Sequence, residues 1–243
     1  MTTQETSTLV DVDALFNLEG IVRDAIQSAK VERTVEQELQ DEPRIEIIHI
    51  MLAQTKAQAA YGGPVPPAAQ RAAFVEQLAQ RIRLRAAKRA EPERFERPIQ
   101  RPLVVTGLMR TGTTLLFNLL ATQQDARAPK LWELWTPVPI SSAPNESEID
   151  PRILAAEQRA HWIHNTLPAF RLMHEIDAHA PEECTFLMME DFCNEAWMLS
   201  MENPPYAEWF LRQDIRDFYR HHRLVLSFLD SFHPPSSHWV LKS

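Results

Sequence analysis

The sequence predicts an α/β protein with a P-loop-type parallel sheet core, incomplete here, a mostly helical N-terminal region and helical insertions. Three observations predict this class. Pro102–Leu116 passes from a β-branched run through glycines into an apolar helical run. A second strand-like run, His238–Lys242, lies near the end of the sequence, and only helical periodicity appears before residue 99. We therefore expect a helical cap over residues 1–98 and the core over residues 99–243.

The N-terminal region shows apolar residues at helical spacing, and glycine or proline follows most of these stretches. Residues 1–10 are expected to be frayed. The last stretch carries a basic run that we interpret as a solvated helix face, with anion binding as the alternative: Arg81, Arg83, Arg85, Lys88 and Arg89. The predicted helices are Asp13–Ala29, continuing over Val31–Leu39, then Arg44–Tyr61 and Pro67–Glu91.

The core begins with a short buried strand at Leu103–Thr106, because its residues are apolar and β-branched. Only this strand and the one around Val240 are predicted, both inside a parallel sheet, so each would expose an unpaired edge. The other core segments are a helix at Thr113–Thr122, a turn at Asp125–Lys130, the Leu131–Pro139 segment, a surface loop at Ser141–Asp150, and helical stretches at Pro151–Thr166, Phe186–Phe192 and Pro204–Phe232.

The turn after the first strand follows the P-loop spacing G-x-x-x-x-G-K-[ST] except at one position. Gly107 and Gly112 occupy the glycine positions, and Thr114 occupies the hydroxyl position. Thr113 replaces the lysine that contacts nucleotide phosphates, while a cation remains inside the loop at Arg110. This pattern favours a planar anion of low charge over a nucleotide bound with Mg²⁺. A turn without any ligand is the alternative.

Composition narrows the possible partners and the compartment. The net charge of −8 disfavours nucleic acid, whose phosphates require a basic face. Cys184 and Cys193 fit no zinc or redox spacing, so we expect reduced core thiols in a cytoplasmic protein. No apolar run reaches the length of a transmembrane segment, and the polar, acidic N-terminus is unlike a signal peptide.

The segment GLMRTGTTLL resembles the 5′-phosphosulfate loop of the sulfotransferases, in particular a bacterial, actinobacterial-type branch. The resemblance continues through LWELWTPVP, HAPEEC, PPYAEWF and the final WVLKS. It implies transfer of a sulfuryl group from 3′-phosphoadenosine-5′-phosphosulfate (PAPS) to a hydroxyl acceptor, with PAPS as co-substrate and no metal. The implied PAPS-binding residues are Gly107, Arg110, Thr111, Gly112, Thr113 and Thr114.

The resemblance also implies roles for three residues. Arg110 would grip the sulfuryl oxygens together with the loop amides, Glu133 would be the general base, and Lys242 would neutralise charge on the leaving oxygen. A buried glutamate paired with an arginine is the structural alternative for Glu133. His174 or His179 is the rival base.

The acceptor is expected to be a small or lipid-like hydroxyl compound in a pocket lined by His174, His179 and Glu183, with Glu182 as a further candidate. These residues lack a strict metal-ligand spacing, so no metal is predicted. The Phe186–Met189 run is interpreted as core; if it lines the pocket, the acceptor is lipophilic. Two histidine pairs are predicted at the surface: His161 with His164, and His221 with His222. Homo-oligomerisation is left open.

The resemblance implies about a third more chain after Ser243, including the serine and arginine that bind the 3′-phosphate. We therefore expect this truncated chain to bind PAPS weakly and to turn over slowly or not at all. Two other functions compete with this one. One is a degenerate P-loop nucleotide kinase, for which Glu190 and Asp191 are the acidic pair after an apolar run. The other is an inactive binding or oligomerisation module.

Overall fold

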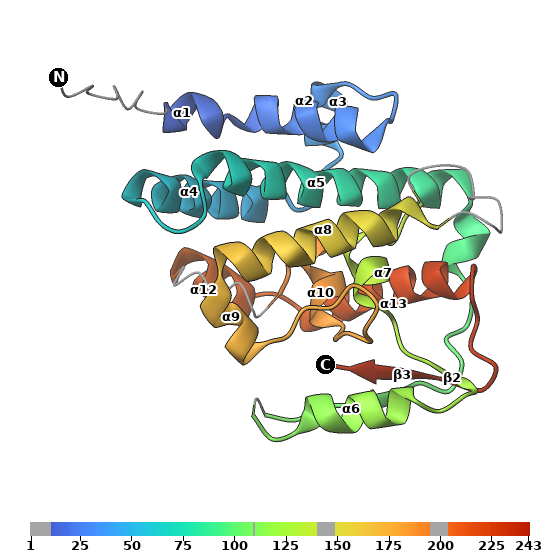
Figure 1. Cartoon of the computed structure of the whole chain (residues 1–243). Coiled ribbons are helices and arrows are strands. Elements are labelled where there is room, and N and C mark those ends of the chain that lie inside the picture. Colours follow the sequence, from blue (N-terminus) through green and yellow to red (C-terminus); the bar gives the residue numbers. More distant parts are fainter. Residues whose placement is uncertain (1–10, 109, 140–148, 195–203) are drawn as a thin grey trace.

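The computed structural model describes residues 11–108, 110–139, 149–194 and 204–243. Its helices lie in layers over a small parallel sheet, and one further helix covers the opposite face of that sheet (Figure 1). This arrangement confirms the predicted α/β class with a helical N-terminal region. Among the described residues, no helix is both long and apolar enough to cross a membrane.

The N-terminal layer contains only helices among the described residues up to 98. The predicted first helix is interrupted, because the Asn17 side chain accepts a hydrogen bond from Gly20 N at 2.9 Å and so begins a new helix. Pro67 begins the long α5, as proline favours the first helical position. The elements are α1 (Val12–Leu15), α2 (Leu18–Ala29), α3 (Val35–Gln40), α4 (Ile45–Tyr61), α5 (Pro67–Ala90) and the 3₁₀ turn η1 (Pro92–Phe95).

The core of this layer extends beyond residue 98. Phe192, Tyr206, Trp209 and Phe218 are buried in the same hydrophobic cluster as the apolar faces of α2, α4 and α5. Packing is therefore continuous across residue 98. The division into two domains at this residue stays a prediction. The N-terminal helices are held to the rest of the chain by burial of apolar surface.

The sheet contains three parallel strands: β1 (Leu103–Val105), β2 (Ala126–Arg127) and β3 (His238–Lys242). Their order is β1-β3-β2, so β3 is central. β2 lies in the predicted Asp125–Lys130 turn, and it covers the edge of β3 that the sequence predicted to be unpaired. The prediction of a buried first strand is wrong for Leu103 and Val104, which are 42% and 50% exposed, because β1 is at the sheet edge; only Val105 is buried.

Alternation along β3 divides the sheet into two faces. Trp239 and Leu241 pack against α13 and α10, while Val240 packs with Phe117 of α6 on the other side. Figure 1 shows α6 on the face of β3 opposite to α13. The sheet is therefore covered on both faces, as is usual for parallel strands.

Most of the remaining helices lie within predicted segments, but α9 was not predicted, and the predicted stretch Pro204–Phe232 is divided into α12 and α13. α8 and β3 have the predicted bounds, whereas Phe186–Phe192 became a short helix followed by a 3₁₀ turn. Most of the predicted surface loop at Ser141–Asp150, and all of residues 1–10, lie outside the described residues. The elements are α6 (Thr113–Ala121), α7 (Leu131–Trp135), α8 (Pro151–Thr166), α9 (Pro168–Met173), α10 (Thr185–Met188), η2 (Met189–Asp191), α12 (Pro204–Leu211) and α13 (Ile215–Asp230).

The interpretation of the basic run as a solvated face is wrong for Arg81 and Arg83, which are 5% and 7% exposed. Arg81 is paired with Glu42 at 2.7 Å and with Asp191, and Arg83 is paired with Glu76 at 2.7 Å. Buried arginines require such partners, since an unpaired charge away from water is costly. The outward-facing part of the run begins only toward the end of α5.

Candidate active site

The glycine-bounded loop lies where β1 ends. β1 stops at Val105, the loop follows, and α6 begins at Thr113. Ligands of open α/β sheets bind beyond the carboxyl ends of the strands, which is the position of this loop. Gly112 begins α6 with a φ of 87°, and the N–H groups of the first helical turn have no partner inside the helix. The loop therefore offers backbone donors and the positive end of a helix dipole to an anion.

Gly107 allows a close approach within the loop. A Cβ at this position would lie 3.0 Å from Cγ2 of Thr113 and 3.4 Å from Oγ1 of Thr111. The Thr111 hydroxyl donates to the Leu108 carbonyl at 2.6 Å, so this hydroxyl closes the loop in the present state instead of pointing to a ligand. The first glycine thus lets the loop fold back against the start of α6.

Arg110 is exposed and adopts a positive φ of 66°. Among the described residues, no carboxylate forms an ion pair with its guanidinium. A non-glycine residue in this left-handed region is uncommon and marks a constrained turn. The loop therefore carries a cation without a counter-charge beside the unpaired amides of a helix start.

Lys242 lies directly beside the loop. It ends β3 and is in register with Val105, and the next backbone N–H, of Ser243, donates to the Val105 carbonyl at 3.0 Å. The Lys242 ammonium is paired with the Glu183 carboxylate. The carboxyl ends of β1 and β3 thus bring Arg110 and Lys242 to one edge of the sheet. Arg110 is the residue predicted to hold the sulfuryl oxygens, and Lys242 is the residue predicted to neutralise the leaving oxygen.

His174 and Glu182 join Lys242 and Glu183 in one polar cluster. Nε2 of His174 is 2.8 Å from Oε2 of Glu182, and Oε1 of Glu182 accepts from Glu183 N at 2.8 Å. The hydrogen bond to Glu182 raises the pKa of His174 above its ordinary value, although partial burial opposes this shift. A carboxylate that orients an imidazole and increases its basicity is a common feature of general-base sites.

The cluster could hold a cation in geometric terms, since ligand atoms of His174, Glu182 and Glu183 lie within 4.8 Å of one another. Each of these side chains already has a partner inside the cluster, and Lys242 supplies a positive charge there. The contacts within the cluster therefore account for the positions of these three side chains without a metal ion.

Glu133 lies in a different setting from the one expected for a base. It is 5% exposed in α7; one carboxylate oxygen is paired with Arg127 and the other accepts from Lys130 N at 3.0 Å. Arg127 in turn stacks over the Trp239 ring, with its central carbon 4.4 Å from the ring centre. This geometry favours the structural alternative, a buried glutamate paired with an arginine.

Two other histidines, His179 and His222, lie in settings that differ from those predicted. His179 lies apart from the cluster and pairs with Glu157 of α8 at 2.7 Å. The surface prediction is wrong for His222, which is 9% exposed and packs edge-on against Tyr219 in α13. Burial lowers the pKa of His222 to about 4, and the neighbouring His221 adds to this shift.

Two further expectations concern buried groups. The two cysteines are free and buried, as predicted; burial raises the pKa of Cys184 to about 12, so it is an inert thiol. Asp191, the aspartate of the kinase hypothesis, is in η2 and pairs with Arg81 and with Arg44, the latter at 2.9 Å. It ends no described strand and is paired with two arginines, so it does not resemble the Mg²⁺-binding aspartate of a kinase.

Glu182 has a larger part in the cluster than its sequence position predicted. Its signal was the pair of carboxylates that follows the two histidines of HEIDAHAPEE, because one carboxylate can orient an imidazole while the other holds the lysine. The antiparallel bridge between Lys130 and Pro181 fixes this segment beside the sheet. The hydrophobic periodicity of a sequence cannot predict such a bridge, because the two residues are far apart along the chain.

The fold and the loop define an α/β protein in which a P-loop-like turn joins β1 to α6. Residues 102–234 match the model of a family described as the sulfotransferase family, and this match covers more than half of the chain. The chain therefore belongs to the sulfotransferase family. No curated protein matches the sequence.

Two solved structures share the fold. The sulfotransferase STF9 from Mycobacterium avium has a TM-score of 0.68 and 24% identity, over 94% of this chain and 57% of that protein. The sulfotransferase STF1 from Mycobacterium tuberculosis has a TM-score of 0.70 and 24% identity, over 93% of this chain and 60% of that protein. The chain thus spans about three fifths of the length of these two proteins.

Proposed function

We propose that this protein transfers a sulfuryl group from PAPS to the hydroxyl group of a small or lipid-like acceptor. The observation that carries the proposal is the register of β1 and β3, which aligns Val105 with Lys242 and so joins the loop to the Lys242 cluster. Family membership supports sulfuryl transfer in general. The donor, the acceptor and the residue roles below are inferences from the site.

The loop fits the 5′ end of PAPS. The close approach at Gly107, the amides at the start of α6 and the uncompensated charge of Arg110 together form a cradle for one sulfate-like group. PAPS, when bound, would supply the sulfuryl group and a phosphate leaving group. The loop amides and the Arg110 guanidinium would hold the sulfuryl oxygens and stabilise their charge during transfer.

Lys242 would act on the leaving group of the displacement, and His174 would act on the attacking hydroxyl group. Lys242, held by Glu183, would donate a hydrogen bond to the leaving oxygen. His174, oriented by Glu182 through Nε2, would accept the proton of the acceptor hydroxyl at its other ring nitrogen, Nδ1. We favour His174 over Glu133 as the base, because both oxygens of Glu133 are engaged in a buried contact.

The test is transfer of ³⁵S from labelled PAPS to an alcohol. We expect His174→Gln to slow transfer by about a hundredfold and to remove the acidic limb of the pH profile, where the wild-type rate falls as His174 becomes protonated. Lys242→Met should slow transfer comparably without weakening binding of the product 3′-phosphoadenosine-5′-phosphate (PAP) by more than about threefold. The control is Lys88→Met, an exposed lysine of α5 outside the site, which should keep the wild-type rate.

Two results would contradict these roles. If Glu133→Gln abolishes transfer while the protein keeps its thermal stability and His174→Gln is active, the base is Glu133. If the wild-type protein transfers no sulfate and binds Mg²⁺-ATP in preference to PAP, the donor assignment is wrong.

A further inference from the structure

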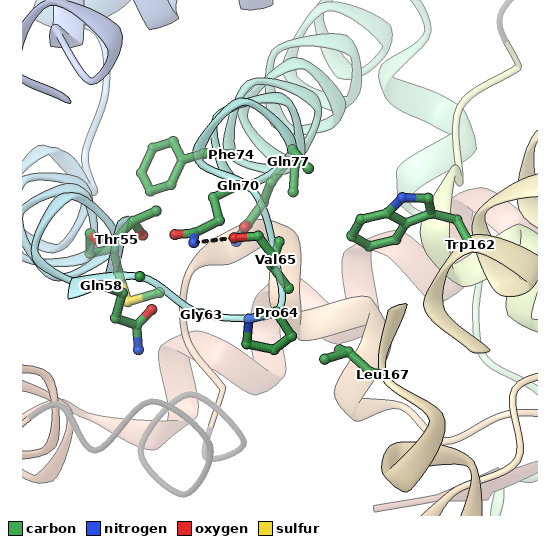
Figure 2. Close-up of a pocket in the computed structure, with 14 residues that line it drawn as sticks. Thr55, Gln58, Gly63, Pro64, Val65, Gln70, Phe74, Gln77, Trp162 and Leu167 are labelled. Carbon is green, nitrogen blue, oxygen red and sulfur yellow. Dashed lines mark hydrogen bonds between the residues drawn. The ribbon is translucent and has the colours of Figure 1, made fainter. Parts of the chain in front are cut away.

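A cavity of about 590 Å³ lies between the turn that joins α4 to α5 and the end of α8 (Figure 2). Figure 2 shows Trp162 and Leu167 on one side, facing Val65 and Pro64 of the turn. The volume is typical of small-molecule binding sites. The lining residues are Met51, Thr55, Gln58, Gly62, Gly63, Pro64, Val65, Ala69, Gln70, Ala73, Phe74, Gln77, Trp162 and Leu167.

The chemistry of the lining selects an uncharged ligand. None of the described lining residues is acidic, basic or a histidine; the polar ones are a threonine and three glutamines. An ionised ligand would lose its hydration here without gaining a counter-charge. The walls are otherwise apolar, with Phe74, Met51 and Trp162 as the largest side chains. The cavity therefore suits an apolar body that carries at most a neutral polar group.

Gln70 contributes one directional contact. Its Nε2 donates to the Val65 carbonyl at 2.9 Å, which fixes the orientation of the amide (Figure 2). Its Oε1 is buried and has no hydrogen-bond partner among the described residues. A buried acceptor without a partner is costly, so a hydroxyl or N–H donor of a ligand would be stabilised at this point.

The short helix α9 connects the cavity to the His174 cluster. Leu167, which lines the cavity, is the residue before α9, and His174 is the residue after it. At a rise of ~1.5 Å per residue, these two residues lie about 10 Å apart along the helix. Leu172 and Met173 of α9 are 86% and 67% exposed and offer apolar contacts along the way, beside the exposed Arg171. An extended molecule with an apolar body can thus reach from the cavity to His174.

We propose that this cavity binds the apolar body of the acceptor, which is an uncharged lipid-like alcohol, and that α9 guides its hydroxyl to His174. The inference rests on the proposed function for the hydroxyl end, whereas the cavity end stands on its own lining. It predicts preference for a medium-length alkyl alcohol over a short one, and over a carboxylate of equal length.

The test measures binding of the neutral fluorescent probe N-phenyl-1-naphthylamine and its displacement by 1-decanol, 1-butanol and decanoate at pH 7. Ala73→Trp places a large side chain into the cavity from the exposed side of α5. The matched control is Ala72→Trp, at the neighbouring exposed position of the same helix, which does not line the cavity. A second variant, Trp162→Ala, removes a wall of the cavity from a different helix.

We expect 1-decanol to displace the probe from the wild type and from Ala72→Trp, and to bind at least about tenfold more weakly to Ala73→Trp and Trp162→Ala. Decanoate and 1-butanol should bind more weakly than 1-decanol to the wild type. Equal affinity of all four proteins for 1-decanol would overturn the proposal, as would preference for decanoate.

A sulfate-transfer assay separates failure of this inference from failure of the proposed function. If 1-decanol binds as expected but no sulfate is transferred, the cavity assignment stands and the proposed function fails. If sulfate is transferred to 1-butanol and 1-decanol with equal KM, and Ala73→Trp leaves both KM values unchanged, the cavity assignment fails and the function stands.

Discussion

Two regions of this protein use arginine in opposite ways. Arg81 is buried in α5, and its guanidinium meets Glu42 at 2.7 Å as well as Asp191. Although burial alone would lower it, these carboxylates raise the pKa of Arg81 above its ordinary value. Arg110 is exposed in the loop after β1, and no described carboxylate pairs with it. The first arginine is committed to the fold, and the second is available to an anion.

The buried network also contains Arg44, which pairs with Asp191 at 2.9 Å, and Arg85, which pairs with Glu42 at 2.8 Å. These contacts join the segment before α4, the middle of α5 and η2, far apart in the sequence. The loop makes no comparable long-range ion pair among the described residues, so its charge is free for binding. The pairing of each arginine is thus a better guide to its role than its position in a basic run.

The largest predicted effect comes from breaking the buried network. Arg81→Met should lower the free energy of unfolding by about 3–5 kcal/mol, since Glu42 and Asp191 would stay buried with fewer partners. Urea denaturation measures this loss. The control is Arg212→Met, in an exposed pair with Glu208 at 3.2 Å, which should cost less than about 0.5 kcal/mol. Equal losses for the two variants would remove the distinction between buried and exposed arginines.

Two histidines extend the comparison to pH. His174 gains a carboxylate partner, whereas His222 is buried without one among the residues that the structure describes. Burial lowers the pKa of His222 to about 4. Between pH 6.5 and pH 4, His222 binds a proton in the unfolded chain but not in the folded chain. The free energy of unfolding therefore decreases as the pH falls from 6.5 toward 4. The expected loss is about 3 kcal/mol.

Urea denaturation at pH 7 and pH 4 tests this effect. His222→Phe keeps a ring in the same contact with Tyr219 and should reduce the difference between the two pH values by the amount assigned to His222. An unchanged pH dependence in the variant would show that other groups cause it.

A smaller effect is expected from the loop itself. Gly107→Ala would place a Cβ 3.0 Å from Cγ2 of Thr113, and the stiff threonine would have to move. We expect this movement to displace the amide donors of the loop and to weaken the affinity for PAP by roughly tenfold in calorimetric titration, which is about 1.4 kcal/mol of binding free energy. At the control site, Gly63→Ala, a Cβ meets nothing within 4 Å. Wild-type affinity in Gly107→Ala would show that the close approach is unimportant for binding.

Local patterns predicted much of the fold. The proline starts of α5 and α8 and the apolar spacing of α4 predicted helices close to those observed, and the strand-like run His238–Lys242 predicted β3. The strand β2 could not be predicted, because two residues carry no periodicity and only pairing with β3 makes them a strand. Burial of Arg81 was missed for a related reason: its partner Asp191 lies beyond any local pattern.

The candidate site likewise has a part that the sequence predicted and a part that it could not predict. The glycine spacing predicted the loop, and the position of Lys242 at a strand end predicted its place beside the loop. The sequence could not show that Arg127 engages Glu133, nor that Glu182 orients His174, because both contacts depend on how the chain folds around the sheet. The cavity beside α5 was likewise absent from the sequence reasoning, since its walls come from three helices.

The most direct test of the central claim is calorimetric titration of PAP into the wild-type protein and into Arg110→Ala. If the unpaired guanidinium binds the 5′ anion, the variant should bind PAP at least about tenfold more weakly while its thermal unfolding is unchanged. Equal PAP affinity in the two proteins would contradict the account, because the loop would then hold no anion through Arg110.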